Sequence, residues 1–244
     1  MRTIKLTISY DGTCYKGWQL QKNAHTVQAE LESAIKKVFR KNHRVSAASR
    51  TDAGVHAKAQ VVHFKTALAI PANKIPLALN KALPEDVVVT HAEEVAPDFH
   101  SRFDAKSKHY CYHILNSRQR DPFSEKYTWR IPYELDISLM RKESAFLKGR
   151  HDFKSFQATD KRERSSVRKV TYVDVKKRKS SITIDISADG FLYNMVRNIV
   201  GTLVDVGRGY LPPGSMRKIL KARDRTQAGP TAPAKGLFLL EVKY

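Results

Sequence analysis

The stretch Ser49-Arg50-Thr51-Asp52-Ala53-Gly54-Val55-His56-Ala57 sets an acidic side chain among small residues, in a segment too short and polar for a protein core. Residues 59–64, which follow it, are rich in β-branched and aromatic side chains and predict a β-strand. We therefore expect Asp52 on a connection between strands, where Gly54 permits a turn that a Cβ would resist. On spacing alone, the pattern is more typical of an Asx-type turn with Arg50 as a solvated neighbour.

The segments around this stretch predict a first unit, residues 1–104, that combines a sheet with helices. Residues 3–10 alternate polar and apolar side chains, as a strand does. Thr26 can cap a helix with one apolar face, and a second helix is expected at 73–83, before Pro84. With a further strand at 87–89, this order suits an antiparallel sheet with helices packed on one face.

Residues 105–244 predict a second unit of the same kind. Strands are expected at 109–115 and 236–242, and as a hairpin at 167–176 and 180–188. Helices are expected after Asp136, at 193–206 and at 215–222. The two halves share an order of elements without a visible residue-level repeat. The predicted fold class is therefore α+β, with two similar sub-domains.

The charge of the chain is far from neutral. Lys and Arg number 44 against 24 Asp and Glu, which gives a net charge of +20 over 244 residues. Such an excess attracts polyanions, usually nucleic acid; the alternatives are a solvated basic surface or an acidic protein partner. No run approaches the roughly 18 apolar residues of a membrane span, and the first residues read as a strand instead of a signal peptide.

The cysteine and histidine patterns predict neither a disulfide framework nor a metal site. Cys14 and Cys111 form no Cys-x-x-Cys pair, which favours a reducing, cytoplasmic compartment. His109 and His113 would meet on a helix, but on a strand they lie ~13 Å apart, too far to share one ion. No phosphate-loop or zinc signature is present, so we expect no cofactor and no metal.

Residues 50–57, Arg-Thr-Asp-Ala-Gly-Val-His-Ala, resemble the signature of the TruA-type tRNA pseudouridine synthases, which usually have Gly where this chain has Ser49. The resemblance extends from Tyr10-Asp11-Gly12 to Tyr244 and includes 103–106, 189–198 and 232–237. It implies that Asp52 is the catalytic nucleophile and that the two sub-domains flank a central active-site cleft. It also implies a homodimer that modifies uridines 38 to 40 in the anticodon stem-loop of tRNA.

Arg197 lies at the edge of the apolar stripe of its predicted helix. Because an arginine there keeps its charge, it needs a carboxylate partner, a phosphate partner or access to solvent, and the sequence alone leaves these open. The resemblance implies a pair with Asp52, which would orient the carboxylate and keep it ionised at neutral pH.

Tyr110 and Tyr112 fall on one face of their predicted strand. A strand tyrosine is most often a core residue whose hydroxyl reaches the surface. The resemblance implies instead that Tyr110 stacks on the target uracil. Arg50 and His56 are expected to help hold the extruded nucleotide.

Basic residues between 161 and 179 are the best candidates for a track along an RNA backbone, although solvated charge would explain some of them. They are Lys161, Arg162, Arg164, Arg168, Lys169 and the run at 176–179. Such contacts position RNA and carry little sequence information.

The expected function is isomerisation of uridine in tRNA. The alternatives are a non-catalytic RNA-binding module and a metal-dependent nuclease, for which no suitable carboxylate cluster is visible.

Overall fold

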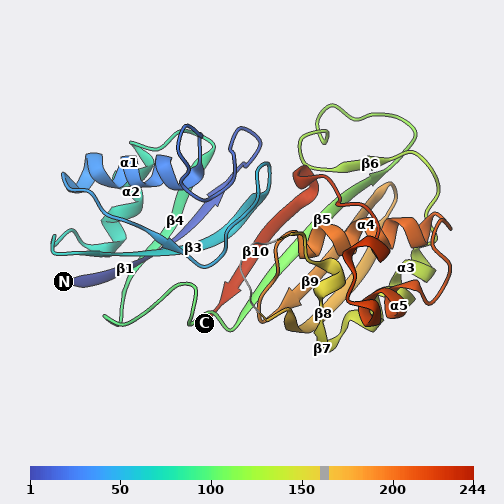
Figure 1. Ribbon diagram of the computed structural model, residues 1–244. Coiled ribbons are helices and arrows are strands. Elements are labelled where there is room, and N and C mark those ends of the chain that lie inside the picture. Colours follow the sequence, from blue (N-terminus) through green and yellow to red (C-terminus); the bar gives the residue numbers. More distant parts are fainter. Residues whose placement is uncertain (160–164) are drawn as a thin grey trace. The chain divides into compact units, whose positions relative to one another are not determined.

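The structure is a computed structural model that describes residues 1–159 and 165–244. It divides into two compact units, drawn in Figure 1: unit 1 comprises residues 1–106 and 238–244, and unit 2 comprises residues 107–237. The last strand, β10 (Leu237–Lys243), is therefore grouped with unit 1, whereas the sequence-based division left it in the second. Phe238 and Leu239 of β10 run parallel to His56 and Ala57 of unit 1.

Unit 1 is a sheet with strand order β4-β1-β3-β10, in which β2 also pairs with β3. Thr26 caps the first helix by accepting a hydrogen bond from the backbone N–H of Ala29, as the sequence predicts. The second helix is shorter than predicted, since Asn80 ends it by exchanging two hydrogen bonds with the backbone of Val89. The elements are β1 (Arg2–Tyr10), α1 (Val27–Phe39), β2 (Ser46–Ala47), β3 (His56–Thr66), the 3-10 turn η1 (Ala72–Lys74), α2 (Ile75–Asn80) and β4 (Val87–Val95).

One face of this sheet forms the core of unit 1. Alternate residues of β1, Ile4, Leu6 and Ile8, are fully buried, whereas the residues between them are not. Phe64 of β3 lies opposite Ile4 and meets the ring of Phe39 edge-on, with 5.4 Å between ring centroids. This period-two pattern is what the alternating sequence of residues 3–10 predicts.

Unit 2 has strand order β5-β9-β8-β7, with β6 on β5. The expectation of purely antiparallel sheets is wrong at two pairs, since β6 runs parallel to β5 and β10 parallel to β3. The excursion over 117–128 is long enough for the crossover that a parallel pair needs. The elements are β5 (Ser107–Asn116), β6 (Trp129–Ile131), α3 (Ile137–Ser144), η2 (Ala145–Leu147), β7 (Gly149–Asp152), η3 (Lys154–Phe156), β8 (Val167–Arg178), β9 (Ser181–Ala188), α4 (Met195–Gly207), α5 (Ser215–Ala222), η4 (Arg225–Gln227) and η5 (Ala234–Gly236).

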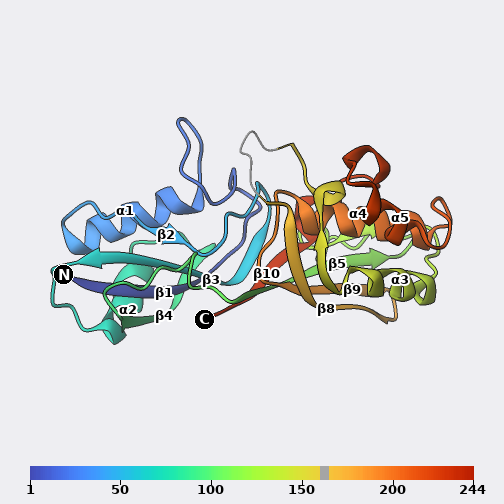
Figure 2. The same ribbon diagram turned by 60° about the horizontal axis from the view of Figure 1, so that its bottom comes forward.

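The core of unit 2 lies between this sheet and α4. Tyr110 and Tyr112 stand opposite Ile186 and Ile184 on one buried face. Helix α4, which lies against β5 and β9 in Figures 1 and 2, buries nearly all of its 13 residues. Within residues 1–159 and 165–244, no helix is both long and apolar enough to cross a membrane.

The burial pattern of β4 allows a paired test of this architecture. Val89 is 1% exposed and its neighbour Val88 is 39% exposed. We expect Val89→Ala to lower the free energy of unfolding by about 2 kcal/mol, because it removes two buried methyl groups and leaves a void. Val88→Ala should cost less than about 1 kcal/mol. Equilibrium denaturation in urea measures both, and equal losses would contradict the assigned face.

Candidate functional site

Asp52 lies on the connection between β2 and β3, which we call the Asp52 loop (residues 49–55). Its side chain is half-buried, whereas those of Arg50 and Ala53 are exposed. The backbone carbonyl of Asp52 accepts a hydrogen bond from the N–H of Val55 at 3.1 Å, and Gly54 turns the chain with a φ of +76°. The sequence prediction of a turn between strands is confirmed, and the carboxylate lies outside the core.

Two buried side chains hold the start of the Asp52 loop. Gln60 of β3 is fully buried, and its amide accepts from the N–H of Ser49 at 3.1 Å and donates to the Ser49 carbonyl at 2.8 Å. The Tyr10 hydroxyl lies 2.8 Å from Oγ1 of Thr51. Burial raises the pKa of Tyr10 to about 12, so this hydroxyl stays protonated near neutral pH. Both contacts come from the sheet and fix the residues next to Asp52.

A second segment, residues 12–18, lies directly against the Asp52 loop. The N–H of Trp18 donates to the carbonyl of Thr51 at 3.0 Å, and the N–H of Gly54 donates to the carbonyl of Tyr15 at 3.3 Å. Gly17 has a φ of +89°, and a Cβ there would lie 2.7 Å from the Thr51 carbonyl oxygen. A Cβ on Gly12 would lie 2.1 Å from the carbonyl oxygen of Val55. Glycine is therefore required at both positions for the two backbones to pack this closely.

His56 does not face the surface. It is 1% exposed, stacks on Phe238 with 4.5 Å between ring centroids, and accepts at Nδ1 from the backbone N–H of Gly12 at 3.0 Å. Nδ1 also lies 3.0 Å from a carboxylate oxygen of Asp11. The ring of His56 is covered in this structure, so its predicted contact with a nucleotide stays a prediction that requires the ring to be uncovered. In this structure His56 positions the turn at Asp11-Gly12.

Arg197 lies in the first turn of α4 and is half-buried. Its Nε donates to the carbonyl of Ala232 at 2.7 Å, and one terminal nitrogen donates to Oδ1 of Asn194 at 3.0 Å. The N–H of Ala232 in turn donates to the backbone carbonyl of Arg197 at 3.1 Å. Asn194 adopts a left-handed conformation, with a φ of +57°, at the position before the helix. The head group of Arg197 is thus aimed by fixed partners.

The segment that aims Arg197 is itself locked to α4. Oδ1 of the fully buried Asn198 accepts from Thr231 Oγ1 at 2.6 Å and from Arg225 at 3.1 Å. A Cβ on Gly201 would lie 1.7 Å from the carbonyl oxygen of Pro230. The helix and the segment over 225–232 therefore pack with their backbones in contact.

The two tyrosines of β5 have different surroundings. Tyr112 is fully buried, its hydroxyl donates to the carbonyl of Pro233 at 2.7 Å, and burial raises its pKa although Arg197 opposes the shift. Tyr110 is 5% exposed and meets Phe191 edge-on at 5.1 Å. Tyr112 is therefore a core residue whose polar end is already bonded. The sequence could not separate the two, because both lie on the same strand face.

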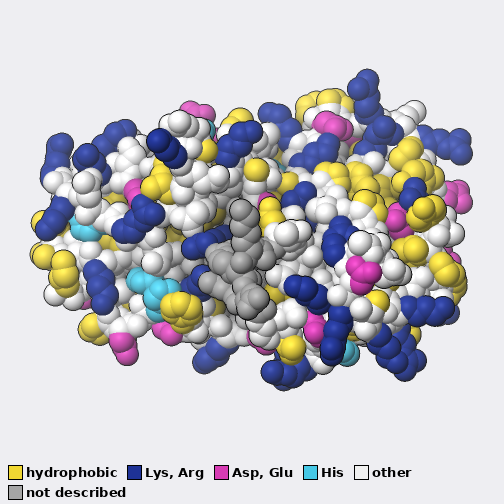
Figure 3. Space-filling model, in the orientation of Figure 1, with side chains coloured by type: hydrophobic (Ala, Val, Ile, Leu, Met, Phe, Trp, Pro, Cys, Tyr) yellow, Lys and Arg dark blue, Asp and Glu magenta, His cyan; other side chains and the backbone are white. Residues whose placement is uncertain are grey.

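The predicted RNA track is described only in part. Arg162 and Arg164, like Lys161, lie outside the described residues. Arg168 is half-buried and donates to the backbone carbonyls of Ser165 and Val167, so its guanidinium is partly engaged by its own chain, whereas the side chain of Lys169 is exposed. Lysine and arginine are spread over the face shown in Figure 3 and do not gather in one patch there.

Gln60 and Asn198 support the candidate residues but were not predicted from the sequence. The same sequence pattern marks both residues, a polar side chain next to an apolar run. Gln60 precedes Val61-Val62, and Asn198 precedes Ile199-Val200. A buried polar side chain must find hydrogen-bond partners, so such a residue indicates a bonded loop nearby.

Comparison with known proteins gives one consistent family. The family model described as tRNA pseudouridine synthase matches residues 6–104 and 144–244. The protein named tRNA pseudouridine synthase A from Thermoanaerobacter sp. (strain X514) is 48% identical over 244 residues, the full length of both chains. Its namesake from Moorella thermoacetica (strain ATCC 39073 / JCM 9320) is 48% identical over 246 residues, again covering 100% of each.

Solved structures give a much weaker likeness. The structure of an H/ACA RNP bound to a substrate RNA containing 2′-deoxyuridine matches 82% of this chain and 44% of its own, with a TM-score of 0.36 and 13% identity. A structural similarity at this level supports no conclusion about the fold of this chain.

The close packing of residues 12–18 on the Asp52 loop predicts the outcome of one substitution. Gly17→Ala should lower the free energy of unfolding by about 2–4 kcal/mol, because it combines left-handed strain with a displaced backbone. Gly209, with a φ of +75° and nothing within 4 Å of an added Cβ, is the matched control and should cost only about 1–2 kcal/mol. Urea denaturation measures both, and equal losses would show that the contact with Thr51 is unimportant.

Proposed function

Because the chain belongs to the tRNA pseudouridine synthase family, we propose that it isomerises uridine to pseudouridine in tRNA, at positions 38 to 40 of the anticodon stem-loop. The observation that carries the proposal is a half-buried aspartate on a rigid, non-core loop, within a chain that is 48% identical to its relatives over its full length. A carboxylate held in this way can act as a nucleophile once a substrate atom is brought to it.

The reaction itself sets what the protein must supply. The bond between C1′ and uracil nitrogen breaks, a bond between C1′ and uracil C5 forms, and the C5 proton is lost while the nitrogen gains one. Since no atom is added or oxidised overall, the chemistry needs no redox cofactor. Asp52 attacks covalently, at C1′ or at uracil C6, and holds the sugar or base while the uracil turns.

The target nucleotide must leave its stack before Asp52 can reach it, which costs a few kcal/mol. In the proposal, Tyr110, which is 5% exposed in this structure, is uncovered when RNA binds and then stacks on the extruded base, and the exposed Arg50 helps to hold its backbone. In the proposal His56 acts indirectly: it holds the Asp11-Gly12 turn by accepting a hydrogen bond from the N–H of Gly12. The geometry of Arg197, whose guanidinium is aimed by Ala232 and Asn194, supports a role as partner of the Asp52 carboxylate.

We assign the nucleophile loop to unit 1, and the stacking tyrosine and partner arginine to unit 2, with both units flanking one active-site cleft. Homodimer formation and a cytoplasmic location belong to the same proposal, which extends the family resemblance. The net charge of +20 supports binding to a polyanion. Lys169 and Arg168, with Arg162 and Arg164 outside the described residues, are the proposed backbone contacts.

Substitution of the nucleophile tests the assignment directly. We expect Asp52→Ala to lower turnover of unmodified tRNA by about four orders of magnitude or more, since no other group can form the covalent bond. The Kd for tRNA should change by less than about threefold, because the carboxylate is not a phosphate contact. Asp98→Ala, which alters an exposed aspartate of the same unit, is the control and should behave as wild type. Full turnover by Asp52→Ala would refute the assignment.

Release of tritium from C5-labelled uridine in tRNA separates the classes of function. A synthase releases it from intact RNA. A non-catalytic RNA-binding module would bind RNA with strong salt dependence and release none. A metal-dependent nuclease would cut the chain and require a divalent ion.

The proposed role of Arg197 gives a second test. Arg197→Lys should lower kcat by about 100-fold with little change in KM, because a point charge cannot replace the planar fork that orients Asp52. Arg217→Lys, on the exposed side of α5, is the control and should leave both constants unchanged. Wild-type kinetics for Arg197→Lys would count against an ion pair with Asp52.

A further inference from the structure

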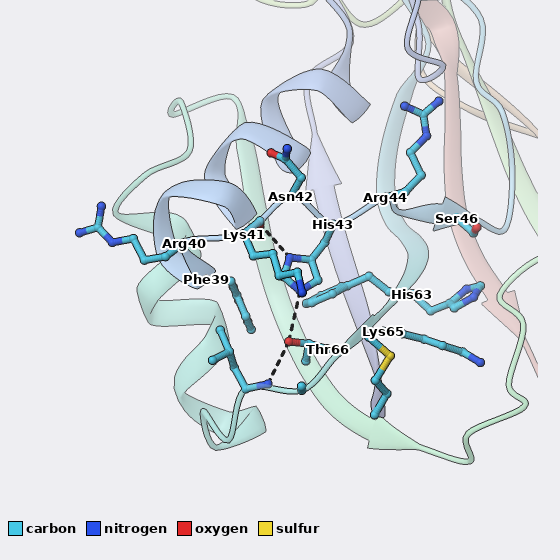
Figure 4. A pocket seen from close by; sticks show the side chains of 14 residues that line it. Phe39, Arg40, Lys41, Asn42, His43, Arg44, Ser46, His63, Lys65 and Thr66 are labelled. Carbon is cyan, nitrogen blue, oxygen red and sulfur yellow. Dashed lines mark hydrogen bonds between the residues drawn. The ribbon is translucent and has the colours of Figure 1, made fainter.

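Unit 1 contains a pocket that plays no part in the site described above. Its volume is about 590 Å³, and it lies where α1 ends, between the 40–44 connection and the final residues of β3 (Figure 4). The Asp52 loop precedes β3 and the pocket lies at the other end of that strand. The pocket therefore belongs to one rigid unit with the proposed nucleophile, but at a distance from it.

The pocket carries a concentrated positive charge. Its lining contains no aspartate or glutamate and four exposed cationic side chains, Arg40, Lys41, Arg44 and Lys65. Figure 4 shows the side chains of Arg40 and Arg44 extending in different directions, away from the group of His43 and Thr66. Among the described residues, Glu32 lies 3.5 Å from Arg44 and also accepts a hydrogen bond from the backbone of Val45, and Asp104 acts together with Lys65 on the lining residue His63. Two carboxylates do not balance four cations.

The connection that carries three of these cations is held in place. His43 bonds to the carbonyl of Lys41 at 2.9 Å and to Oγ1 of Thr66 at 3.2 Å, and its ring lies edge-on between Phe39 and Phe64. Arg40 ends α1 in a left-handed conformation with a φ of +54°. The rim is thus presented by a fixed backbone, although each cationic side chain can still turn toward a ligand.

Compensation of the helix dipole does not account for this cluster. Cations near the end of α1 would be stabilised by its terminal carbonyls, which explains Lys36, Lys37 and Arg40. Lys65 comes from β3, and Arg44 lies beyond the last turn of the helix, where the effect has faded. These cations come from separate elements that line one cavity, although Lys65 points to the opposite face of β3 from Phe64 and Thr66.

The aromatic floor decides which part of a nucleic acid the pocket suits. Phe39 and Phe64 are 2% and 1% exposed, so neither offers a face on which a base could stack. What the pocket offers is a cationic rim of flexible donors, which matches a phosphate group. We propose that this pocket binds a backbone phosphate of the tRNA substrate, as an anchor separate from the active site; the identity of the RNA rests on the proposed function.

Distance places the anchored phosphate outside the anticodon arm. From His56 to Thr66, β3 advances ten residues, which is ~33 Å at ~3.3 Å per residue. At about 3 Å of rise per base pair, a helical stem must be about ten base pairs long to span that gap. An isolated anticodon hairpin is shorter, so only a larger part of the tRNA reaches both places.

The test compares two RNAs on one pair of variants. Lys41→Gln/Lys65→Gln removes one cation from each of two elements, and Lys36→Gln/Lys37→Gln removes two exposed cations of α1 that do not line the pocket. For full-length unmodified tRNA at about 0.15 M salt, we expect the first variant to weaken binding about tenfold. It should also reduce the slope of log K against log salt by about 0.9, the value for one phosphate contact. For the isolated anticodon hairpin, Kd and kcat/KM should stay within twofold of wild type.

The control and the reverse outcomes complete the test. Lys36→Gln/Lys37→Gln should change neither RNA's affinity by more than about twofold, and Lys41→Arg/Lys65→Arg should restore binding, since arginine also pairs with phosphate. Undiminished tRNA binding by the Gln variant would overturn the proposal. An equal loss of affinity for the isolated hairpin would also overturn it, as would an equal loss in the Lys36→Gln/Lys37→Gln control. Either result would indicate that only the overall positive charge of the protein matters. A wild-type protein that binds tRNA through the pocket but forms no pseudouridine would refute the proposed function alone.

Discussion

The rest of the candidate site depends on one backbone contact, that of residues 12–18 with the Asp52 loop. The loop has few side chains of its own that could fix it, because small and polar residues dominate it. Its rigidity comes from main-chain hydrogen bonds to Tyr15 and Trp18, made possible by glycine at positions 12 and 17. A side chain on a loop held by backbone loses little freedom when a ligand arrives, which is how preorganised sites reduce the cost of reaching the transition state.

Unit 2 uses the same physical solution for a different side chain. Gly201 lets the 225–232 segment touch α4, and Ala232 then both accepts from and donates to Arg197. In both units the candidate residue, Asp52 or Arg197, lies beside a backbone segment that packs closely only because a glycine faces it. A Cβ on Gly17 or Gly201 would displace that segment. Buried amides, Gln60 in one unit and Asn198 in the other, complete the hydrogen bonding behind it.

The sequence predicts the elements of this fold well, because their signals are local. The Thr26 cap, the alternation in β1 and the apolar stripe of α4 each follow from neighbouring residues and recur in the structure. The partners of β10 and β6 were missed, because parallel pairing depends on distant segments. The position of Asp52 on a turn was predictable from composition. The burial of His56 was not, since it results from Phe238, which is far away in sequence.

The pairing of β10 with β3 has a consequence for biosynthesis. During translation, residues 237–243 emerge only after all of unit 2 has been made, at least roughly ten seconds after β3 at ~5–20 residues per second. Until then His56 has no aromatic neighbour from that strand, and the edge of β3 beside the Asp52 loop is open. The nascent chain thus carries the Asp52 loop on an unfinished sheet, whose β3 edge is covered only after residues 107–237 have been made.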